Sequence, residues 1–238
     1  MKTKRTTPDV LTDTRLLAIA GMVRRGSVAA DIGTDHGHLI CHLVGQGISP
    51  RGFGCDINLG PLAACAKTVA RHGLSDKITL RKTNGLSGLP LEEIDDIIIA
   101  GMGGDLIAEI LTAAPAARDS RLRFILQPMT KADKLRSSLC RGGYAIEREI
   151  AVCEGGNLYT VMQATFTGKS VEADELFALV GLLPKEDTPE SRELFAQTVS
   201  RLRRAARGLA KAQTAQEREK AVHYQKLADT IEKMGRDR

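Results

Sequence analysis

The sequence predicts an α/β protein with an open, doubly wound, mostly parallel seven-stranded sheet, an antiparallel edge and a C-terminal all-α helical hairpin. Five short apolar runs alternate with segments of helical periodicity, which is typical of β–α repeats in a parallel sheet. Two later apolar runs have only five residues between them, and this spacing predicts an antiparallel hairpin. Strand patterns end after Gly168. We therefore expect two domains, residues 1–168 and residues 169–238.

The first third of the chain predicts one helix followed by two strand–turn–helix units. Thr12 or Asp13 is placed to cap the first helix, and Gly26 is placed to end it. Buried strands are expected at 28–30 and 52–55, and the helices that follow them at about 38–46 and from Pro61 onward.

The middle of the chain continues the alternation and then changes direction. Residues 97–100 form a continuous apolar run, which is typical of a strand buried on both faces of a parallel sheet. The other strands of this part are expected at 78–80, 124–126, 144–152 and 158–166, with helices around 106–111 and 135–139.

The last third predicts two helices. Apolar residues recur at intervals of four and three, at Phe195, Val199, Leu202, Ala206 and Leu209 and again at Tyr224, Leu227, Ile231 and Met234. The polar stretch 211–217 has no apolar seam, so a reversal there would give an antiparallel hairpin. One long helix is the alternative.

Composition indicates a folded, intracellular protein. Of 238 residues, 42% are hydrophobic and 26% are charged, which is ordinary for a globular chain. No stretch approaches 18 uncharged apolar residues, and no apolar segment follows the charged start, so we expect neither a membrane span nor a signal peptide. The five cysteines are scattered without a C-x-x-C pair, which favours reduced thiols and a cytoplasmic location.

Positive charge is concentrated in the tail. Residues 185–238 hold 13 Lys and Arg against 9 Asp and Glu, whereas the rest holds 21 against 20. A polyanion such as RNA is a plausible partner, and the absence of Trp argues against binding by rows of stacked bases. The basic strip Arg201, Arg203, Arg204, Arg207 and Lys211 could face RNA, although a solvated helix face explains it equally well. Failing that, the candidates are Arg24, Arg25, Lys131 and Arg136.

One Gly-rich turn has the position of a binding loop. Asp31, Gly33, Asp35 and Gly37 lie between a strand and a helix, at the carboxyl edge where doubly wound folds bind ligands. The turn lacks the G-x-G-x-x-G that a dinucleotide requires, and its carboxylates would repel a pyrophosphate. It favours S-adenosylmethionine, which has a positive pole, with Asp56 on the ribose hydroxyls. The alternative is that these acids are solvated turn residues and helix caps.

A metal site is not expected. His36, His38 and His42 have a spacing that could ligate a metal, but no cysteine or third helical ligand accompanies them. They are better explained as loop and helix-face residues.

The sequence resembles the bacterial tRNA (adenine-22-N1)-methyltransferase family along nearly its whole length. The pair D-I-G-T-D-H and A-G-M-G-G is specific to that family, and the matches are residues 31–37, Asp56, 84–86, 100–104, 126–128 and 179–183. The resemblance implies a Rossmann-like class I methyltransferase with S-adenosylmethionine as cofactor, followed by an antiparallel coiled coil. It also implies methylation of N1 of an adenosine in the D arm of tRNA.

Carried onto this sequence, the resemblance implies site residues. The cofactor loop is matched by Asp31, Gly33, Asp35, His36 and Gly37. Asp56 matches the ribose partner, and Asn84 takes the place facing the adenine, where the family often has Asp. The expected cofactor set is completed by Ile57, Gly85, Gly101, Met102 and Gly103.

Candidates for chemistry and substrate binding follow from the reaction. Methylation leaves positive charge on the base, which a nearby carboxylate would stabilise, so Asp35 is the first catalytic candidate and His36 a weaker one. Candidate substrate-binding residues are Gly104, Asp105, Arg201, Arg204 and Arg207. We expect a monomer that binds tRNA. The alternatives are a non-catalytic tRNA-binding protein that retains a cofactor pocket and an NAD-dependent oxidoreductase, which would share the fold and Asp56.

Overall fold

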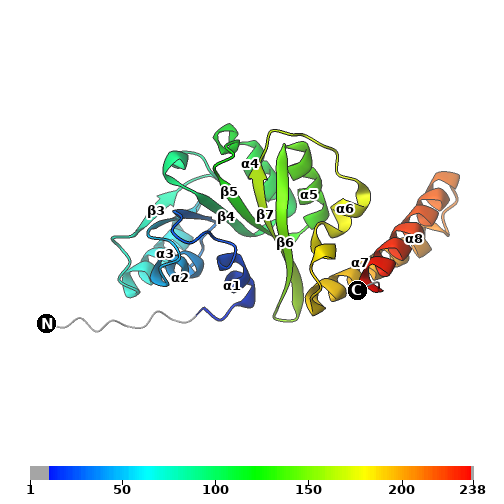
Figure 1. Ribbon diagram of the computed structural model, residues 1–238, viewed down its shortest axis with the longest axis horizontal. Coiled ribbons are helices and arrows are strands. Elements are labelled where there is room, and N and C mark those ends of the chain that lie inside the picture. Colours follow the sequence, from blue (N-terminus) through cyan, green and yellow to red (C-terminus); the bar gives the residue numbers. More distant parts are fainter. Residues whose placement is uncertain (1–10, 237–238) are drawn as a thin grey trace.

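A seven-stranded sheet with helices on both faces forms the body of the molecule, and a helical hairpin extends from one side of it (Figure 1). The computed structural model describes residues 11–236. The strand order β3-β2-β1-β4-β5-β7-β6 confirms the predicted doubly wound sheet. Strand β7 runs antiparallel to both of its neighbours, β5 and β6, and the other strand pairs are parallel. The strands are β1 (Ala29–Ile32), β2 (Gly52–Asp56), β3 (Ile78–Lys82), β4 (Asp96–Gly103), β5 (Arg123–Thr130), β6 (Tyr144–Glu154) and β7 (Asn157–Phe166).

The helices cover the sheet in two layers. The bounds are α1 (Thr14–Ala20), α2 (His38–Gly45), α3 (Leu59–Arg71), α4 (Gly104–Thr112), α5 (Ala132–Arg141), α6 (Glu175–Val180), α7 (Pro189–Leu209) and α8 (Ala215–Arg236), with short 3-10 turns η1 (Leu91–Glu93), η2 (Pro115–Ala117) and η3 (Leu183–Lys185). Along β4, Ile98 packs in the core shared with α1, α2 and α3, whereas Ile97 and Ile99 pack in the core shared with α4 and α5. The continuous apolar run thus serves both faces, as predicted.

Two predicted boundaries in the first unit are wrong. Asp13 caps α1 as expected, but the helix ends at Ala20, six residues before Gly26. Gly26, with φ 83°, lies in the turn that leads into β1, where its N–H donates to Ile48. Asp31 belongs to β1 rather than to the loop, because it pairs in register with Gly54 on one side and Ile98 on the other.

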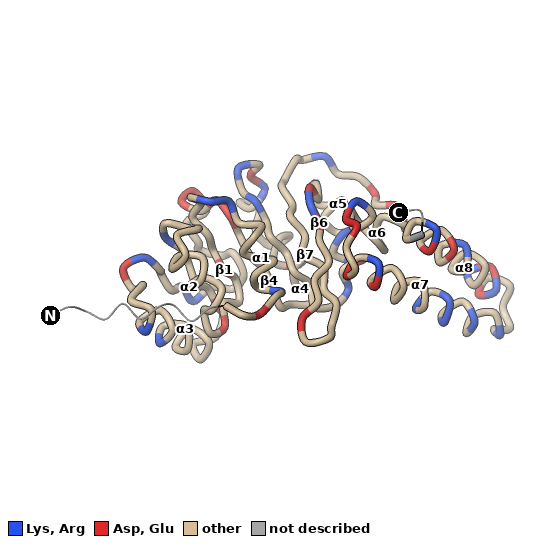
Figure 2. The backbone as a smooth tube through the Cα atoms, turned by 60° about the horizontal axis from the view of Figure 1, so that its bottom comes forward, with Lys and Arg blue, Asp and Glu red and all other residues tan. Residues whose placement is uncertain are grey.

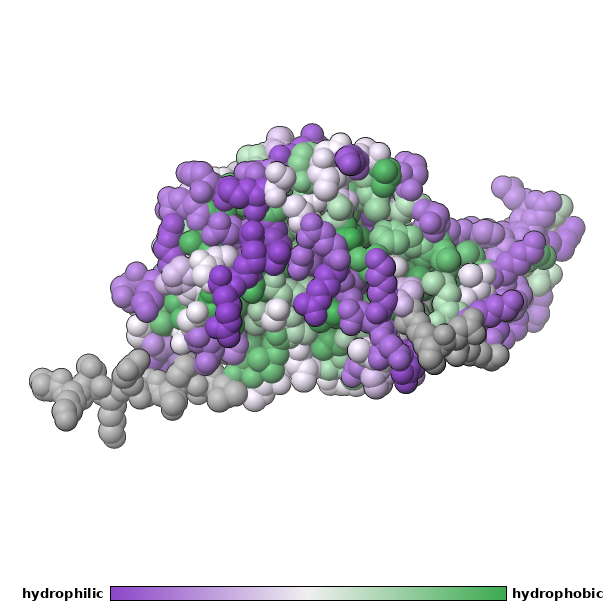
Figure 3. Space-filling view, in the orientation of Figure 1, coloured by the Kyte–Doolittle hydropathy of each residue, from purple (hydrophilic) through white to green (hydrophobic). Residues whose placement is uncertain are grey.

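The C-terminal helices form the predicted hairpin, and the single long helix is excluded. Helix α7 ends at Leu209, α8 begins at Ala215, and the two pack together through a small apolar core. Ala151 of β6 also packs against this core. On the face drawn in Figure 3, hydrophilic residues cover the outer end of the hairpin, and hydrophobic residues gather where it meets the sheet. The domain boundary at residue 168 and the coiled-coil character of the hairpin stay predictions.

A buried ion pair connects the sheet to the segment that leads into the hairpin. Glu149 of β6 accepts from Nε and Nη2 of Arg136 on α5, at 2.9 and 2.6 Å, and both side chains are almost fully buried. Nη1 of Arg136 donates to the carbonyls of Ala178 and Leu179, and Glu149 also accepts from the N–H of Leu182. Two charges of β6 and α5 therefore hold α6 and the turn after it.

This arrangement corrects one expectation about the basic residues. Arg136 is buried and fully engaged, so it is not a surface residue available to RNA. Arg24 is likewise paired, with the buried Asp96 at the start of β4, at the opposite end of the strands from the Gly-rich turn.

Gly181 gives a test of the buried joint. Its φ is +57°, and a Cβ there would overlap Glu149 Oε2 and approach Nε of Arg136 at 2.5 Å. Gly181→Ala is expected to lower the free energy of unfolding by more than about 3 kcal/mol, since it strains the backbone and separates a buried pair. Gly208→Ala is the control: Gly208 is on α7 with open space around it, so alanine should stabilise by about 0.5 to 1 kcal/mol. Equal midpoints of urea unfolding for the two variants would contradict a stabilising role of the buried Arg136–Glu149 pair at Gly181.

Candidate functional site

A cavity of about 440 Å³ lies at the carboxyl edge of the sheet, where β1, β2 and β4 end. Asp31 and Asp56 come to it from adjacent parallel strands, and Gly101 and Met102 come from the end of β4. Because parallel strands end at the same edge, residues 25 to 71 positions apart in the sequence meet here.

Asp31 is the buried acid of this cavity. Its side chain is 5% exposed and accepts a 2.8 Å hydrogen bond from Oγ1 of Thr34. The pKa of Asp31 is raised from 3.8 to about 6. Burial is the main cause, the hydrogen bond from Thr34 acts in the opposite direction, and the charge of Asp56 adds a smaller rise. A carboxylate held in this way is less stable than one in water, so a cation brought beside it would gain from the pairing.

The turn after β1 takes a conformation that most side chains disfavour. Gly33 has φ 76° and Gly37 has φ 73°, and added Cβ atoms would overlap Met102 Cε and Cys65 Sγ respectively. Asp35 also lies in the left-handed region, at φ 48°, with a 72% exposed side chain 3.7 Å from Nε2 of His36. Asp and Asn tolerate this region better than other non-glycine residues. The chain can therefore place a carboxylate at a position whose backbone conformation favours glycine.

The turn at the end of β4 is fixed by a buried amide. Oε1 of Gln127, inside β5, accepts from the N–H of Gly101 at 3.1 Å and from Nη1 of Arg15 at 2.8 Å. Gly101 has φ 77°, and the register between β4 and β5 shifts on either side of Met102. The Gln127 side chain thus holds an irregular piece of backbone in place beside the cavity.

The structure brings together part of the predicted set. Around the cavity lie Asp31, Gly33, Asp35, His36, Asp56, Gly101 and Met102. The other predicted cofactor residues do not line it. Gly37 is buried against Cys65, Gly103 precedes α4, and the remaining three, Ile57, Asn84 and Gly85, follow β2 and β3. The roles of all these residues stay predictions.

Sequence reasoning missed Arg15. It lies on the first turn of α1, lines the cavity, and is 19% exposed. Its guanidinium also approaches Asp13 at 3.3 Å and lies 5.9 Å from the centre of the Tyr159 ring. In the sequence it is one basic residue near a helix start, and no periodicity or motif singles it out. Only its bond to Gln127, 112 residues away, places it in the site.

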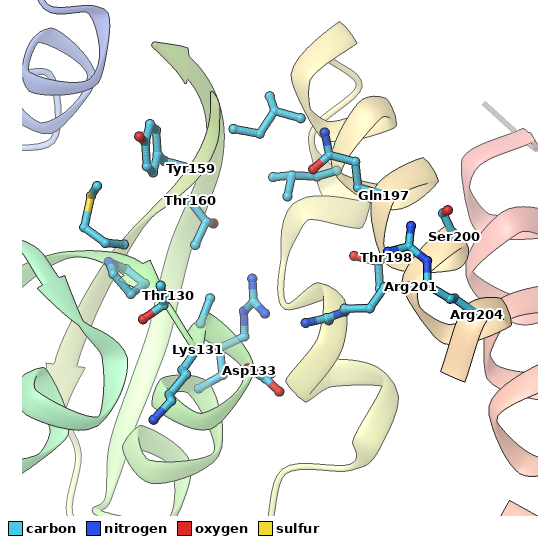
Figure 4. Close-up of a pocket in the computed structure, with 16 residues that line it drawn as sticks. Thr130, Lys131, Asp133, Tyr159, Thr160, Gln197, Thr198, Ser200, Arg201 and Arg204 are labelled. Atoms are coloured by element: carbon cyan, nitrogen blue, oxygen red, sulfur yellow. The ribbon is translucent and has the colours of Figure 1, made fainter. Parts of the chain in front are cut away.

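A second cleft, of about 500 Å³, separates the end of β5 and the start of α5 from helix α7 (Figure 4). Arg201 points into it from α7, and Gln197 and Arg204 come from the same helix. Lys131 and Tyr159 lie on the opposite wall. Two of the predicted substrate-binding arginines therefore face the sheet domain beside the end of β5.

The other predicted substrate residues lie elsewhere. Arg207 borders a groove between α7 and α8, and Arg203, part of the expected basic strip, is paired with Asp229 and Glu232 of α8. Asp105 forms an ion pair with Lys131, which lowers the pKa of its carboxyl.

Gly104 has a packing role. It is buried, and a Cβ would overlap the backbone carbonyl of Lys131, so close packing of α4 against the β5–α5 connection explains this glycine. The predicted contact of Gly104 with substrate stays a prediction.

Residues 11–236 contain neither a cluster of metal-ligating side chains nor a membrane-spanning helix. Within that range no three His, Cys, Asp or Glu side chains are grouped closely enough to hold a metal ion. The rings of His36 and His38 stack on each other at 5.8 Å. In the same range no helix combines the length and apolarity that crossing a membrane requires.

Comparison with known proteins defines the class of protein. The family model of the methyltransferase domain matches residues 12–162, which contain the whole carboxyl-edge cavity. The chain therefore belongs to the methyltransferase-domain family.

Closer relatives define the particular family. The chain is 34% identical over 169 residues to the tRNA (adenine(22)-N(1))-methyltransferase of Bacillus subtilis, covering 71% of each chain. The crystal structure of the B. subtilis m1A22 tRNA methyltransferase TrmK is 29% identical, with a TM-score of 0.82 over 92% of this chain and 98% of that one. The Streptococcus pneumoniae protein Sp1610, a putative tRNA (m1A22) methyltransferase in complex with S-adenosyl-L-methionine, is 28% identical, with a TM-score of 0.79 over 92% and 98%. This chain belongs to the tRNA (adenine(22)-N1)-methyltransferase family.

Asp31→Asn tests the electrostatic description of the cavity. A raised pKa means that the folded protein binds more protons than the unfolded chain between pH 3.8 and about 6, so the charge costs stability as pH rises through that window. Asparagine keeps an acceptor for Thr34 without the charge. We expect the ligand-free variant to be more stable than the wild type by roughly 1 to 3 kcal/mol at pH 7 and by little at pH 4.

The measurement is chemical denaturation at the two pH values. Asp35→Asn is the matched control, because its exposed side chain should leave stability within about 0.5 kcal/mol. A gain for Asp31→Asn that is the same at pH 4 and pH 7 would mean that charge burial is not its cause.

Proposed function

We propose that this protein transfers a methyl group from S-adenosylmethionine to N1 of adenosine 22 in the D arm of tRNA. The observation that carries the proposal is the carboxyl-edge cavity with Asp31 and Asp56 on adjacent strands, in a chain of this family. The NAD-dependent alternative is not supported, because no G-x-G-x-x-G follows β1.

The residues of the cavity fit S-adenosylmethionine. Asp31 is a buried acid that gains from a cation, and we infer that it faces the cofactor's amino group. Asp56 is half-buried at the end of β2, and we infer that its carboxylate accepts from the ribose hydroxyls. Gly33 has no side chain, so a ligand can approach its backbone closely. A Cβ at this position would overlap Met102. When bound, the cofactor supplies an electrophilic methyl group on a sulfonium.

The chain's contribution to chemistry is positioning and charge. Ring N1 of adenine has an in-plane lone pair and is nucleophilic when neutral, so no general base is required. N1 lies on the Watson–Crick edge, so the base must be unpaired or flipped before it can reach the cavity. The fixed Gly101 turn leaves space beside the cavity, and the exposed Asp35 carboxylate would stabilise the positive charge that develops on the base.

The cleft beside α7 is the proposed path of the tRNA backbone. It lies next to the end of β5, and Arg201, Arg204 and Lys131 line it. Figure 2 shows basic residues, all of them Arg, at intervals along α7. Phosphate binding by this helix would hold the D arm while the sheet domain receives one adenosine.

Cellular location and assembly rest on the sequence alone. The cytoplasmic location and the monomeric state stay predictions.

The activity is tested with purified protein, methyl-labelled S-adenosylmethionine and bulk tRNA, followed by nucleoside analysis. We expect 1-methyladenosine to form, and a transcript with guanosine in place of adenosine 22 to remain unlabelled. Cofactor binding without label in any tRNA would favour the non-catalytic alternative, and binding of NAD in place of S-adenosylmethionine would favour the oxidoreductase.

Asp35→Asn tests the proposed role of charge in the chemical step. The variant keeps the shape and the left-handed conformation, so cofactor affinity should change less than about threefold, while the single-turnover rate should fall roughly tenfold or more. The control is Asp76→Asn, an exposed acid in the turn before β3, at the opposite end of the strands. A wild-type rate with saturating tRNA and cofactor would remove Asp35 from the chemistry.

Charge removal on α7 tests the tRNA path. Truncating the tail is unsuitable, because residues 178–182 hold the buried Arg136–Glu149 pair. We expect Arg201→Met with Arg204→Met to weaken tRNA binding and to lower the slope of log affinity against log salt by roughly 0.7 to 0.9 per lost phosphate contact. Arg207→Met, on the other side of α7, should have a smaller effect.

Affinity for S-adenosylhomocysteine serves as the folding control for these variants and should not change. If Arg207→Met is as damaging as the double variant, the tRNA does not follow the cleft.

A further inference from the structure

We propose that Arg15 binds the carboxylate of the cofactor's methionine part and so selects the intact amino-acid group of S-adenosylmethionine. This rests on the proposed use of that cofactor, and it concerns a residue that no motif of the sequence identifies.

The charge balance of the cavity requires such a residue. Its lining includes the acids Asp31, Asp35 and Asp56, and Arg15 is the single Lys or Arg among the described residues that line it. At neutral pH the cofactor carries an ammonium and a sulfonium, which suit these acids, and a carboxylate, which they would repel. A carboxylate in an acidic cavity is stabilised by a neighbouring cation, and a guanidinium is the cation that matches it in shape.

Arg15 also stands at the correct end of the cavity. The neighbouring strands run β2, β1, β4, β5, with Asp56 at the end of β2 and Asp31 at the end of β1. Arg15 is bonded to Gln127 of β5, which pairs with Ala100 of β4, and its Nη1 lies 4.0 Å from where a Cβ of Gly101 would be. Two strand spacings, about 10 Å, separate the ends of β2 and β4. A ligand with its ribose at Asp56 and its amino group at Asp31 therefore extends toward Arg15.

The guanidinium is held before any ligand arrives. Oε1 of the buried Gln127 and Oδ2 of Asp13 each take one Nη of Arg15, at 2.8 and 3.3 Å, and the Tyr159 ring lies 5.9 Å from its carbon. Helix α1 is itself fixed to the tip of the β6–β7 hairpin, where Thr14 donates to Glu154 and to the carbonyl of Cys153. These bonds use two of the five N–H donors of the guanidinium and leave others for a carboxylate.

A phosphate of the tRNA is a different ligand for the same cation. The position of Arg15 favours the cofactor, because it lines the acidic cavity and does not line the basic cleft beside α7. The experiment separates the two.

The test compares two ligands that differ only in the carboxylate. S-Adenosylhomocysteine contains it, and S-adenosyl-3-thiopropylamine, the decarboxylated form, keeps the amino group but lacks it. Calorimetry would measure both affinities for the wild type, Arg15→Met, Arg15→Lys and the control Arg25→Met, an exposed arginine in the turn before β1. We expect the wild type and Arg25→Met to prefer S-adenosylhomocysteine by roughly 10- to 100-fold, Arg15→Met to bind both ligands equally, and Arg15→Lys to fall between.

Three results would overturn the proposal. If Arg15→Met keeps the wild-type affinities for both ligands and for tRNA, the carboxylate is bound elsewhere. If the affinity of Arg15→Met falls by the same factor for both ligands, Arg15 only stabilises the Gly101 turn. Unchanged affinity for both with weakened tRNA binding would assign Arg15 to a phosphate. None of these outcomes depends on methyl transfer, so they are distinct from a failure of the proposed function.

Discussion

The buried pair of Arg136 and Glu149 is the interaction on which the arrangement of the two parts depends. Burying two charges is costly unless each finds several partners, and here the partners are backbone groups of residues 178–182. The pair therefore fixes where the chain leaves the sheet, and with it the position of α7. Because Arg201 points from α7 toward the end of β5, the shape of the proposed tRNA cleft follows from a contact that lies outside both cavities. The exclusion of a side chain at Gly181 is part of the same constraint.

The sheet was predictable from the sequence because its pattern is local. Continuous apolar runs such as Ile97–Ile99, separated by helical segments, permit few topologies, and the five-residue connection after Val152 permits only a hairpin. The meeting of Asp31 with Asp56 followed from the same reasoning, since adjacent parallel strands end at one edge. The reversal after α7 was likewise indicated by the polar stretch 211–217.

What could not be predicted depends on contacts between distant residues. Helix α6 has six residues, too few for periodicity to indicate, and the side chain of Arg136 accounts for its position by bonding carbonyls at its end. The early end of α1 is a local effect instead, because the N–H groups of Met22 and Val23 donate to the carbonyls three residues earlier and close a tighter turn. Arg15 enters the site only through Gln127, and the conformation of Asp35 is visible only as a torsion angle.

At the carboxyl edge of the sheet, a residue proposed to bind the ligand also lowers the stability of the ligand-free protein. Asp31 is placed where its charge costs free energy in the ligand-free protein, and Thr34 offsets only part of that cost. A cationic ligand beside Asp31 would lower this pKa toward its ordinary value and would offset the cost of burying the charge. Arg15 has the complementary position, a cation held ready by Gln127 on the side of Asp31 that faces away from Asp56. A ligand that carries an ammonium and a carboxylate on one carbon gains from both Asp31 and Arg15, and one that carries a single charge gains from one.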